Sequence, residues 1–369
     1  MSGMQMPPEG RKATWWQRFE LAVARRLLTL PGPLQVCLSG RPPVVVAGQT
    51  LHPQMQLLLA LHAWLRPGPL SGRTPREARA TLRAEAIGIS GRPVEVGAVA
   101  DLTIETDSGV RAARHYAPLA GGPQPLLVYF HGGGFVAGDI ETHDCVCRRI
   151  CRHAGIHVLS VDYRLAPEHP FPAAVEDAVA AFRWARARAP SLGARPDKVA
   201  VGGDSAGGNL AAVVCLKAAR DGSPAPCAQI LLYPPMDRTT DRPSIALFRD
   251  GFLLTREDMD WYQLQYTGTT RAQPIPEQYP LCADDLSGLA PALIVTAGFD
   301  PLRDEGEAYA FALRRAGVTA ELRRFDGLLH GFCSMAPIAP VCEAAMREIC
   351  AEISALLDAT AGQTAPAKE

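Results

Sequence analysis

The chain of 369 residues lacks an excess of charge of either sign. It has 37 lysines and arginines against 38 aspartates and glutamates, and its formal net charge at pH 7 is −1. Proteins that bind nucleic acid neutralise rows of phosphates with a strongly basic surface. Because this chain has no such surplus of positive charge, nucleic acid is excluded as an expected partner.

The sequence also lacks a long hydrophobic run. Residues 42–65 contain no Asp, Glu, Lys or Arg, but their prolines, histidines and glutamines make the stretch too polar for the interior of a bilayer. Residues 1–10 show no basic start followed by an apolar segment, so a secretory signal peptide is not predicted. We therefore expect a cytoplasmic protein.

A disulfide framework is not expected either, although the chain has ten cysteines. Such frameworks are typical of short secreted domains, and this chain is long. Cys145, Cys147 and Cys151 are close in sequence but lack the paired C-x-x-C spacing of a zinc site. We interpret them as reduced thiols packed as small apolar groups, and we predict neither a metal ion nor another cofactor.

The first part of the chain, residues 1–96, has the pattern of helices without a sheet domain. Apolar side chains recur at helical spacing over about 14–30 and 51–65. Segments rich in proline and glycine separate these stretches. We expect an N-terminal extension and cap helices here, and a disordered tail at the other end of the chain, residues 361–369.

Residues 97–360 change to an α/β pattern. A β-hairpin is predicted around the turn at 107–109, and short apolar runs then alternate with helical stretches. Such alternation is typical of a mostly parallel sheet flanked by helices. The runs predicted as buried strands are 126–130, 157–161, 199–201, 230–233, 293–296 and 320–325.

The strongest local signal is the sequence Gly-Asp-Ser-Ala-Gly-Gly at 203–208. An apolar β run precedes it and a helix-forming run over 206–220 follows, which is the context of a nucleophile elbow. Glycines on both sides of Ser205 leave room for so sharp a turn. We therefore interpret Ser205 as a nucleophile. The alternative is a glycine-rich helix N-terminus that only caps, and the strand that leads into the turn disfavours it.

A serine hydroxyl needs a base, and the only histidine after Ser205 is His330. The hydrolase order of nucleophile, acid and histidine therefore makes His330 the base. Among the aspartates between them, only Asp300 directly follows a buried strand. There it would fix the tautomer of the imidazole and stabilise its cation. Asp304, a helical turn further on, is expected to cap or brace the loop.

Three consecutive glycines, residues 132–134, follow His131 at the end of a predicted strand. Their unobstructed N–H groups suit the oxygen anion that develops in a tetrahedral intermediate. With the amide of Ala206 at a helix N-terminus, they would form an oxyanion hole of three donors. The alternative is a merely flexible turn, and the place of the loop after this strand and before the elbow disfavours it.

Five motifs in the same order resemble the hormone-sensitive-lipase-like branch of the α/β-hydrolases, which includes bacterial carboxylesterases. They are HGGGF at 131–135, DYRLAPEHPFPA at 162–173, GDSAGG at 203–208, DPLRDE at 300–305 and HGF at 330–332. The resemblance extends over about 51–358. It implies an α/β-hydrolase fold with a mainly helical cap, a Ser-Asp-His triad and short-to-medium acyl esters as substrates.

The resemblance assigns roles to individual residues. The nucleophile, base and acid would be Ser205, His330 and Asp300, and the oxyanion donors would be Gly133, Gly134 and Ala206. The motif at 163–173 is interpreted as structural support below the active site. Residues proposed for a substrate pocket are His131, Gly132, Phe135, Asp204, Trp261 and Tyr262. For the last two, packing in the core is the favoured alternative.

The resemblance also implies that the cap combines the N-terminal helices with an insertion at about 237–273. Residues 1–50 exceed the usual start of such enzymes. The amphipathic stretch 14–30 would pack on the cap or lie on a membrane surface, and we favour packing because three arginines make a thin basic face. The family resemblance makes a homodimer through the last strand and helix plausible.

We therefore predict a serine carboxylesterase that acts on small neutral esters through an acyl-enzyme. An amidase or formamidase would use the same three residues, and the sequence does not separate these activities. A ligand-binding receptor on a hydrolase fold is the other alternative. It is disfavoured because Ser205, Asp300 and His330 are all present, and site rather than fold decides function.

Overall fold

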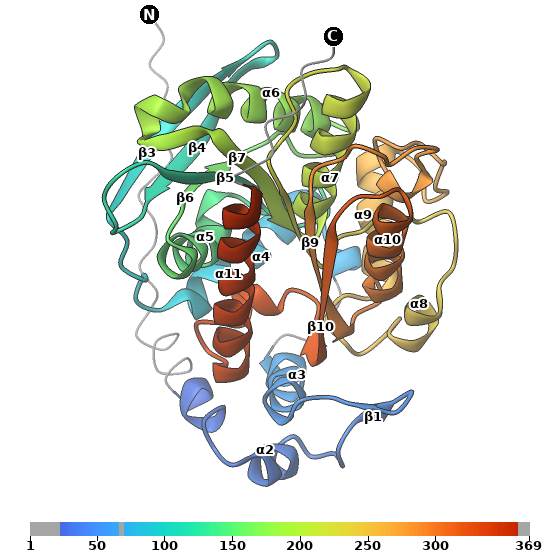
Figure 1. Cartoon of the computed structure of the whole chain (residues 1–369). Helices are drawn as coiled ribbons and strands as arrows, with labels where there is room; N and C mark the ends of the chain where they lie inside the picture. Colours follow the sequence, from blue (N-terminus) through green and yellow to red (C-terminus); the bar gives the residue numbers. More distant parts are fainter. Residues whose placement is uncertain (1–22, 66–69, 361–369) are drawn as a thin grey trace, which may run out of the picture.

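The computed structural model of the protein describes residues 23–65 and 70–360. An eight-stranded sheet in the order β10-β9-β8-β7-β5-β6-β4-β3 crosses the molecule, with helices on both faces (Figure 1). Only the pairs that involve β4 are antiparallel, so the predicted mostly parallel sheet is confirmed. The strands are β3 (Ala98–Thr106), β4 (Gly109–Ala117), β5 (Gln124–Phe130), β6 (His157–Val161), β7 (Ala194–Asp204), β8 (Gln229–Leu232), β9 (Ala292–Phe299) and β10 (Ala320–Leu329).

Each of the six runs predicted as buried strands overlaps one of the strands β5 to β10, and the predicted hairpin is β3–β4. The helices described are α2 (Gly32–Leu38), α3 (Pro53–Leu65), α4 (Pro75–Ser90), α5 (Ile140–Ala154), α6 (Ala173–Arg188), α7 (Ala206–Arg220), α8 (Pro243–Leu247), α9 (Arg256–Thr267), α10 (Arg303–Arg315) and α11 (Pro340–Ala359). No helix in these ranges combines the length and apolar character needed to cross a bilayer.

The central strand β5 shows why the sheet is covered on both faces. Its residues alternate between two apolar clusters because successive side chains of a strand point to opposite faces. Leu126, Val128 and Phe130 join the cluster under α6, α7 and α10. Leu127 and Tyr129 join the cluster under α5 and α11. Every one of these side chains is at most 1% exposed, which is why the strand appears in the sequence as a continuous apolar run.

Helices α4, α5 and α9 each begin with a capping box. In this motif two side chains three residues apart satisfy each other's backbone N–H groups. The pairs are Thr74 with Glu77, Asp139 with Thr142 and Thr255 with Asp258. These reciprocal bonds fix the residue at which each helix starts, and therefore the direction of the side chains in its first turn.

The N-terminal segment differs from the prediction in one respect, because it contains a short antiparallel ribbon. β1 (Val45–Val46) pairs with β2 (Gln49–Thr50) around Ala47 and Gly48, whose φ angles are 51° and 80°. Two consecutive positive φ angles are the geometry of a tight hairpin turn. The ribbon adjoins the end of β10, where Gln49 donates to Asp326 and accepts from Arg303. Its pairing therefore depends on long-range contacts.

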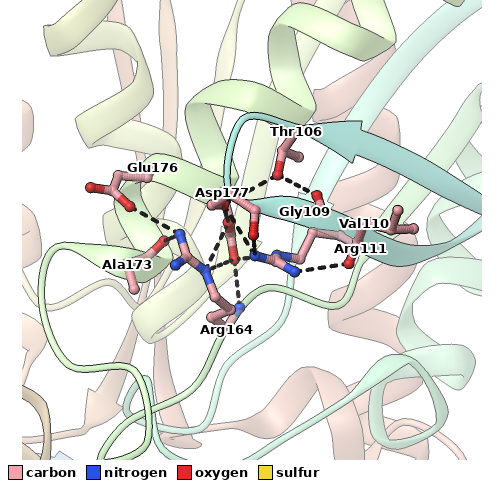
Figure 2. A network of polar contacts seen from close by, with 9 residues as sticks. Thr106, Gly109, Val110, Arg111, Arg164, Ala173, Glu176 and Asp177 are labelled. Carbon is pink, nitrogen blue, oxygen red and sulfur yellow. Dashed lines mark hydrogen bonds and ion pairs between the residues drawn. The ribbon is translucent and has the colours of Figure 1, made fainter.

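The motif at 163–173 is held to α6 and β4 by one buried carboxylate. Asp177 accepts hydrogen bonds from the backbone N–H and Nε of Arg164 and from Nε of Arg111, as Figure 2 shows. Burial alone would raise the pKa of Asp177, but these hydrogen bonds lower it. The end of the motif contacts α9, since the Phe171 N–H donates to the Tyr266 carbonyl oxygen. These contacts agree with the structural role predicted for the motif.

The cysteines are free thiols in the described structure, as predicted. Cys145, Cys147 and Cys151 lie on the buried face of α5. Burial raises the pKa of the Cys145 thiol to about 11 and that of the Cys151 thiol to about 12. Among residues 23–65 and 70–360, no group of three or more His, Cys, Asp or Glu side chains is placed to hold a metal ion.

A buried pair of histidines joins two neighbouring strands of the sheet. His115 Nε2 of β4 lies 2.9 Å from His157 Nδ1 of β6, and the two rings are stacked. Burial and the neighbouring His157 lower the pKa of His115 to about 4, and burial lowers the pKa of His157. His115 therefore stays neutral in the folded protein well below pH 6.5, the value at which an exposed histidine titrates, and the pKa of His157 is shifted in the same direction.

We expect this pair to make folding sensitive to acid. The unfolded chain takes up these protons near pH 6.5, whereas folded His115 resists until about pH 4. The contribution of His115 is complete above pH 6.5 and is lost as the pH falls toward 4, by about 3 kcal/mol in total. Urea unfolding should show the stability difference between wild type and His115→Asn shrinking from pH 7 to pH 4.5. The exposed control His169→Asn should show no such trend, and a pH-independent difference for His115→Asn would contradict the prediction.

Candidate active site

Ser205 occupies a strained turn between β7 and α7. Its φ angle is 50°, which is unusual for a residue with a side chain, and its N–H donates to the Leu232 carbonyl oxygen over 2.8 Å. A Cβ atom at Gly203 or Gly207 would lie 2.2 or 1.8 Å from the Phe130 carbonyl oxygen. Only glycine permits this approach to β5, so the glycines of the motif allow the turn that exposes the serine hydroxyl.

The structure brings Ser205, His330 and Asp300 into one hydrogen-bonded chain. Ser205 Oγ lies 3.1 Å from His330 Nε2, and His330 Nδ1 lies 2.8 Å from Asp300 Oδ2. Asp300 directly follows β9 and His330 directly follows β10, so neighbouring parallel strands deliver both side chains to the same edge of the sheet. A carboxylate only accepts, so Nδ1 carries the hydrogen and Nε2 of the neutral ring is free to accept from the serine.

Neighbouring groups hold the side chains of Asp300 and His330 in these positions. Asp300 is fully buried, and its other oxygen accepts the Leu302 N–H over 2.8 Å. The Tyr233 ring lies edge-on to the imidazole of His330, with 4.9 Å between ring centroids. Asp304 does not reach the histidine. It accepts from the Ser244 N–H and from Nε of Arg303, and so it braces the loop, as the sequence predicted.

The glycine loop follows β5 and has a conformation that excludes side chains. Gly133 and Gly134 have φ angles of 115° and 62°. A Cβ atom at Gly133 would lie 2.1 Å from the Ala137 carbonyl oxygen, and one at Gly134 would lie 2.3 Å from the Tyr262 ring. The glycine loop therefore packs tightly against the backbone of Ala137 on one side and against the Tyr262 ring of α9 on the other. This packing argues against the alternative of a merely flexible turn.

A cavity of about 510 Å³ opens over these residues. Ser205, His330, Gly133, Gly134 and Ala206 all lie on its wall, together with residues of α3, α4 and α9. The volume is in the range of sites for small molecules. Most of the remaining wall is apolar, and it includes Leu28, Leu58, Leu61, Leu82, Ile89, Leu253, Leu254, Met259, Met335 and Ile338.

Three of the six residues predicted for the pocket line this cavity, namely Phe135, Asp204 and Tyr262. The other three, His131, Gly132 and Trp261, do not, and the prediction is corrected for them. His131 is fully buried and stacks on Tyr163, with 4.3 Å between ring centroids, and Gly132 is turned toward the Asp204 carboxylate. Trp261 and Tyr262 both pack against the apolar core, as the alternative held, and Tyr262 lines the cavity as well.

Helix α4 connects the N-terminal part of the chain to the glycine loop. Arg79 donates to the carbonyl oxygens of Val136 and Ala166, each over 2.7 Å, and pairs with Glu168. Val136 follows the loop directly, so this helix both walls the cavity and anchors the segment beside it. Of the predicted amphipathic stretch 14–30, residues 14–22 lie outside the described residues, as does the tail 361–369. In the described part, Ala24 and Leu28 line the cavity.

A buried polar cluster beneath the glycine loop was missed by the sequence reasoning. Asp204 Oδ1 accepts from the Tyr129 hydroxyl over 2.6 Å and from the Gly132 N–H over 3.0 Å. His143 Nε2 lies 3.3 Å from Asp204 Oδ2. Burial alone would raise the pKa of Asp204, but the neighbouring His143 and the hydroxyl donor lower it. The one available signal was a histidine on the buried face of α5.

Comparison with known proteins agrees with this fold. Residues 127–334 match the family model described as alpha/beta hydrolase fold. The carboxylic ester hydrolase LipN of Mycobacterium tuberculosis is 50% identical over 313 residues, which cover 83% of each chain. The ethyl acetate hydrolase of Pseudomonas putida is 36% identical over 275 residues, covering 73% of this chain and 86% of that protein.

Solved structures show the same similarity. The ester hydrolase EH1AB1 from the metagenome of Lake Arreo superposes with a TM-score of 0.80 at 40% identity, covering 83% of this chain and 98% of that chain. An esterase of Pyrobaculum calidifontis gives a TM-score of 0.76 at 39% identity, covering 83% of this chain and 99% of that chain. The chain belongs to the α/β-hydrolase family, in the hormone-sensitive-lipase-like carboxylesterase branch.

Proposed function

We propose that this carboxylic ester hydrolase is a serine esterase in which Ser205 takes up the acyl group of a small neutral ester. The observation that carries the proposal is the chain of hydrogen bonds from Ser205 through His330 to Asp300 on the wall of an apolar cavity. The printed names of the relatives, which are ester hydrolases, support the reaction class. A solved neighbour was crystallised with a bipyridine phosphonate derivative.

In the first half of the reaction, Ser205 Oγ attacks the ester carbonyl carbon while His330 Nε2 takes the hydroxyl proton. The carbonyl oxygen becomes an anion, which the N–H groups of Gly133, Gly134 and Ala206 stabilise. When the intermediate collapses, the bond to the alcohol breaks and His330 returns the proton to the leaving oxygen. Asp300 keeps the imidazole in the reactive tautomer and stabilises its cation throughout.

In the second half, water takes the place of the alcohol. His330 accepts a proton from the water as its oxygen attacks the acyl carbon, and the same N–H groups hold the second oxyanion. When this intermediate collapses, the bond between the acyl carbon and Ser205 Oγ breaks, His330 gives its proton to Oγ, and the carboxylic acid leaves. Besides the ester and water, these steps use only the side chains and amides already described.

The size and apolar lining of the cavity predict how hydrolysis depends on acyl length. Burial of each CH₂ group contributes about 0.8 kcal/mol, so kcat/KM for p-nitrophenyl esters should rise about fourfold per CH₂ from acetate to hexanoate. The rise should stop once the acyl chain outgrows the cavity. Initial rates across the series, with one leaving group throughout, test this. A flat or falling series from acetate onward would contradict an acyl site in this cavity, and the anilide of the best acyl group would reveal an amidase.

A further inference from the structure

His143 is a buried histidine at the edge of the proposed active site that the mechanism above does not use. It lies in the first turn of α5, nine residues after Gly134 of the glycine loop. Its side chain lines the same cavity as Gly133 and Gly134. The residue is nevertheless only 5% exposed. Its two ring nitrogens point to different partners, and those partners define its protonation.

Both ring nitrogens of His143 face an oxygen that can accept a hydrogen bond. Thr142 Oγ1 lies 2.7 Å from the Asp139 carbonyl oxygen, to which its hydroxyl can donate, and 2.8 Å from His143 Nδ1, from which it can accept. On the other side of the ring, Nε2 faces Asp204 Oδ2 at 3.3 Å, and a carboxylate only accepts. An imidazole that donates from both nitrogens is an imidazolium cation.

The charges next to His143 favour the same state. Burial alone would lower the pKa of His143, but the Asp204 carboxylate raises it above its ordinary value. Tyr129 and Asp139 also face this cluster from β5 and from the start of α5, and His131 lies 5.4 Å from the ring of His143 by centroid distance. Glu85 of α4 lines the same cavity.

We propose that His143 works as a cation and is a positioning residue for the oxyanion-binding loop. Its charge holds Asp204, whose other oxygen binds the Gly132 N–H and so sets the backbone that leads into Gly133 and Gly134. The same cation places positive charge beside the site where the oxyanion develops. The proposal rests on the serine-esterase function proposed above and adds a residue to it.

Loss of the proton from His143 would reverse this arrangement. The Gly132 N–H points to His143 Nε2, 3.3 Å away, as well as to Asp204 Oδ1, 3.0 Å away. A neutral Nε2 would accept from this N–H in competition with Asp204, whereas the cation leaves it to Asp204 alone. Asp204 would also remain as a buried anion without its cation, next to Ser205 in the chain. Negative charge at this point opposes formation of the oxyanion. The enzyme therefore needs two histidines in opposite states, His330 neutral and His143 charged.

The experiment is the dependence of kcat/KM on pH between 5 and 10 for wild type, His143→Gln and the control His153→Gln, a histidine further along α5. The kcat/KM of wild type should rise and then fall with pH, and the fall at alkaline pH should follow the loss of the proton from His143. His143→Gln should lower kcat by about 10- to 100-fold, leave KM within about twofold and lose the alkaline fall. His153→Gln should keep both limbs of the profile.

Rates are expressed per site that reacts with a fluorophosphonate, so that a loss of folded protein does not mimic the effect. Failure of Ser205 to react in wild type would overturn the esterase function itself. Normal labelling, with a wild-type rate and alkaline fall in His143→Gln, would overturn only the role of His143. Nitrogen NMR of histidine-labelled wild type is a test without any variant, since His143 should carry two protonated ring nitrogens at pH 7, and a neutral ring would overturn the proposal.

Discussion

Replacing Ser205 with alanine is expected to lower kcat for a p-nitrophenyl ester by about 10⁴- to 10⁶-fold, the range found when the nucleophile of a serine hydrolase is removed. The loss is large because no other described hydroxyl lies within hydrogen-bonding distance of His330 Nε2. Alanine fits the elbow without new contacts, since it only lacks Oγ. The fold should therefore persist, and the residual rate should reflect the oxyanion site alone.

The measurement is the initial rate at saturating substrate, with the Tm of the variant compared with that of wild type. Ser223→Ala is the matched control, because Ser223 lies in the loop after α7 and has no place in the proposed mechanism. It should hydrolyse the ester at the wild-type rate. Activity of Ser205→Ala within tenfold of wild type would require a different nucleophile and would contradict the mechanism.

The second large effect is expected for Asp300→Asn, with a loss in kcat of about 10⁴-fold and little change in KM. An asparagine of the same shape can donate to His330 Nδ1, which favours the tautomer with the hydrogen on Nε2. In that tautomer the imidazole no longer accepts the Ser205 proton. The rest of the site should be unaffected, because the other oxygen position still accepts the Leu302 N–H.

Asp304→Asn is the matched control for this substitution. Its carboxylate accepts from Ser244 and Arg303 rather than from the histidine, so its loss should cost stability and leave kcat within about tenfold of wild type. Steady-state kinetics of the two variants, measured side by side, give the comparison. Equal losses in kcat for Asp300→Asn and Asp304→Asn would contradict the assignment of the acid.

The residues that meet at the reacting centre could be predicted because each lies at the end of a buried strand. Ser205 follows β7, Asp300 follows β9 and His330 follows β10, and the carboxyl ends of parallel strands meet at one edge of a sheet. Apolar runs define the strands, and chain order then leaves one histidine for the base. The fold and the residues of the site could therefore be predicted from local sequence patterns and from the order of the motifs.

What could not be predicted depends on contacts between distant segments. His143 is 61 residues from Asp204 in sequence, and nothing local indicates that its ring meets that carboxylate. The β1–β2 ribbon is two residues long on each side and owes its place to the end of β10. Trp261 and Tyr262 are neighbours on α9 and both pack against the core, yet only Tyr262 also lines the cavity.

The most direct test of the account is the site at which a fluorophosphonate reacts. Intact-mass and peptide mass spectrometry should show one phosphonyl group per chain, attached to Ser205, with ester hydrolysis lost in proportion to labelling. The Ser205→Ala variant should remain unlabelled. Complete loss of hydrolysis with the adduct on another residue, or continued hydrolysis by fully labelled protein, would contradict Ser205 as the nucleophile.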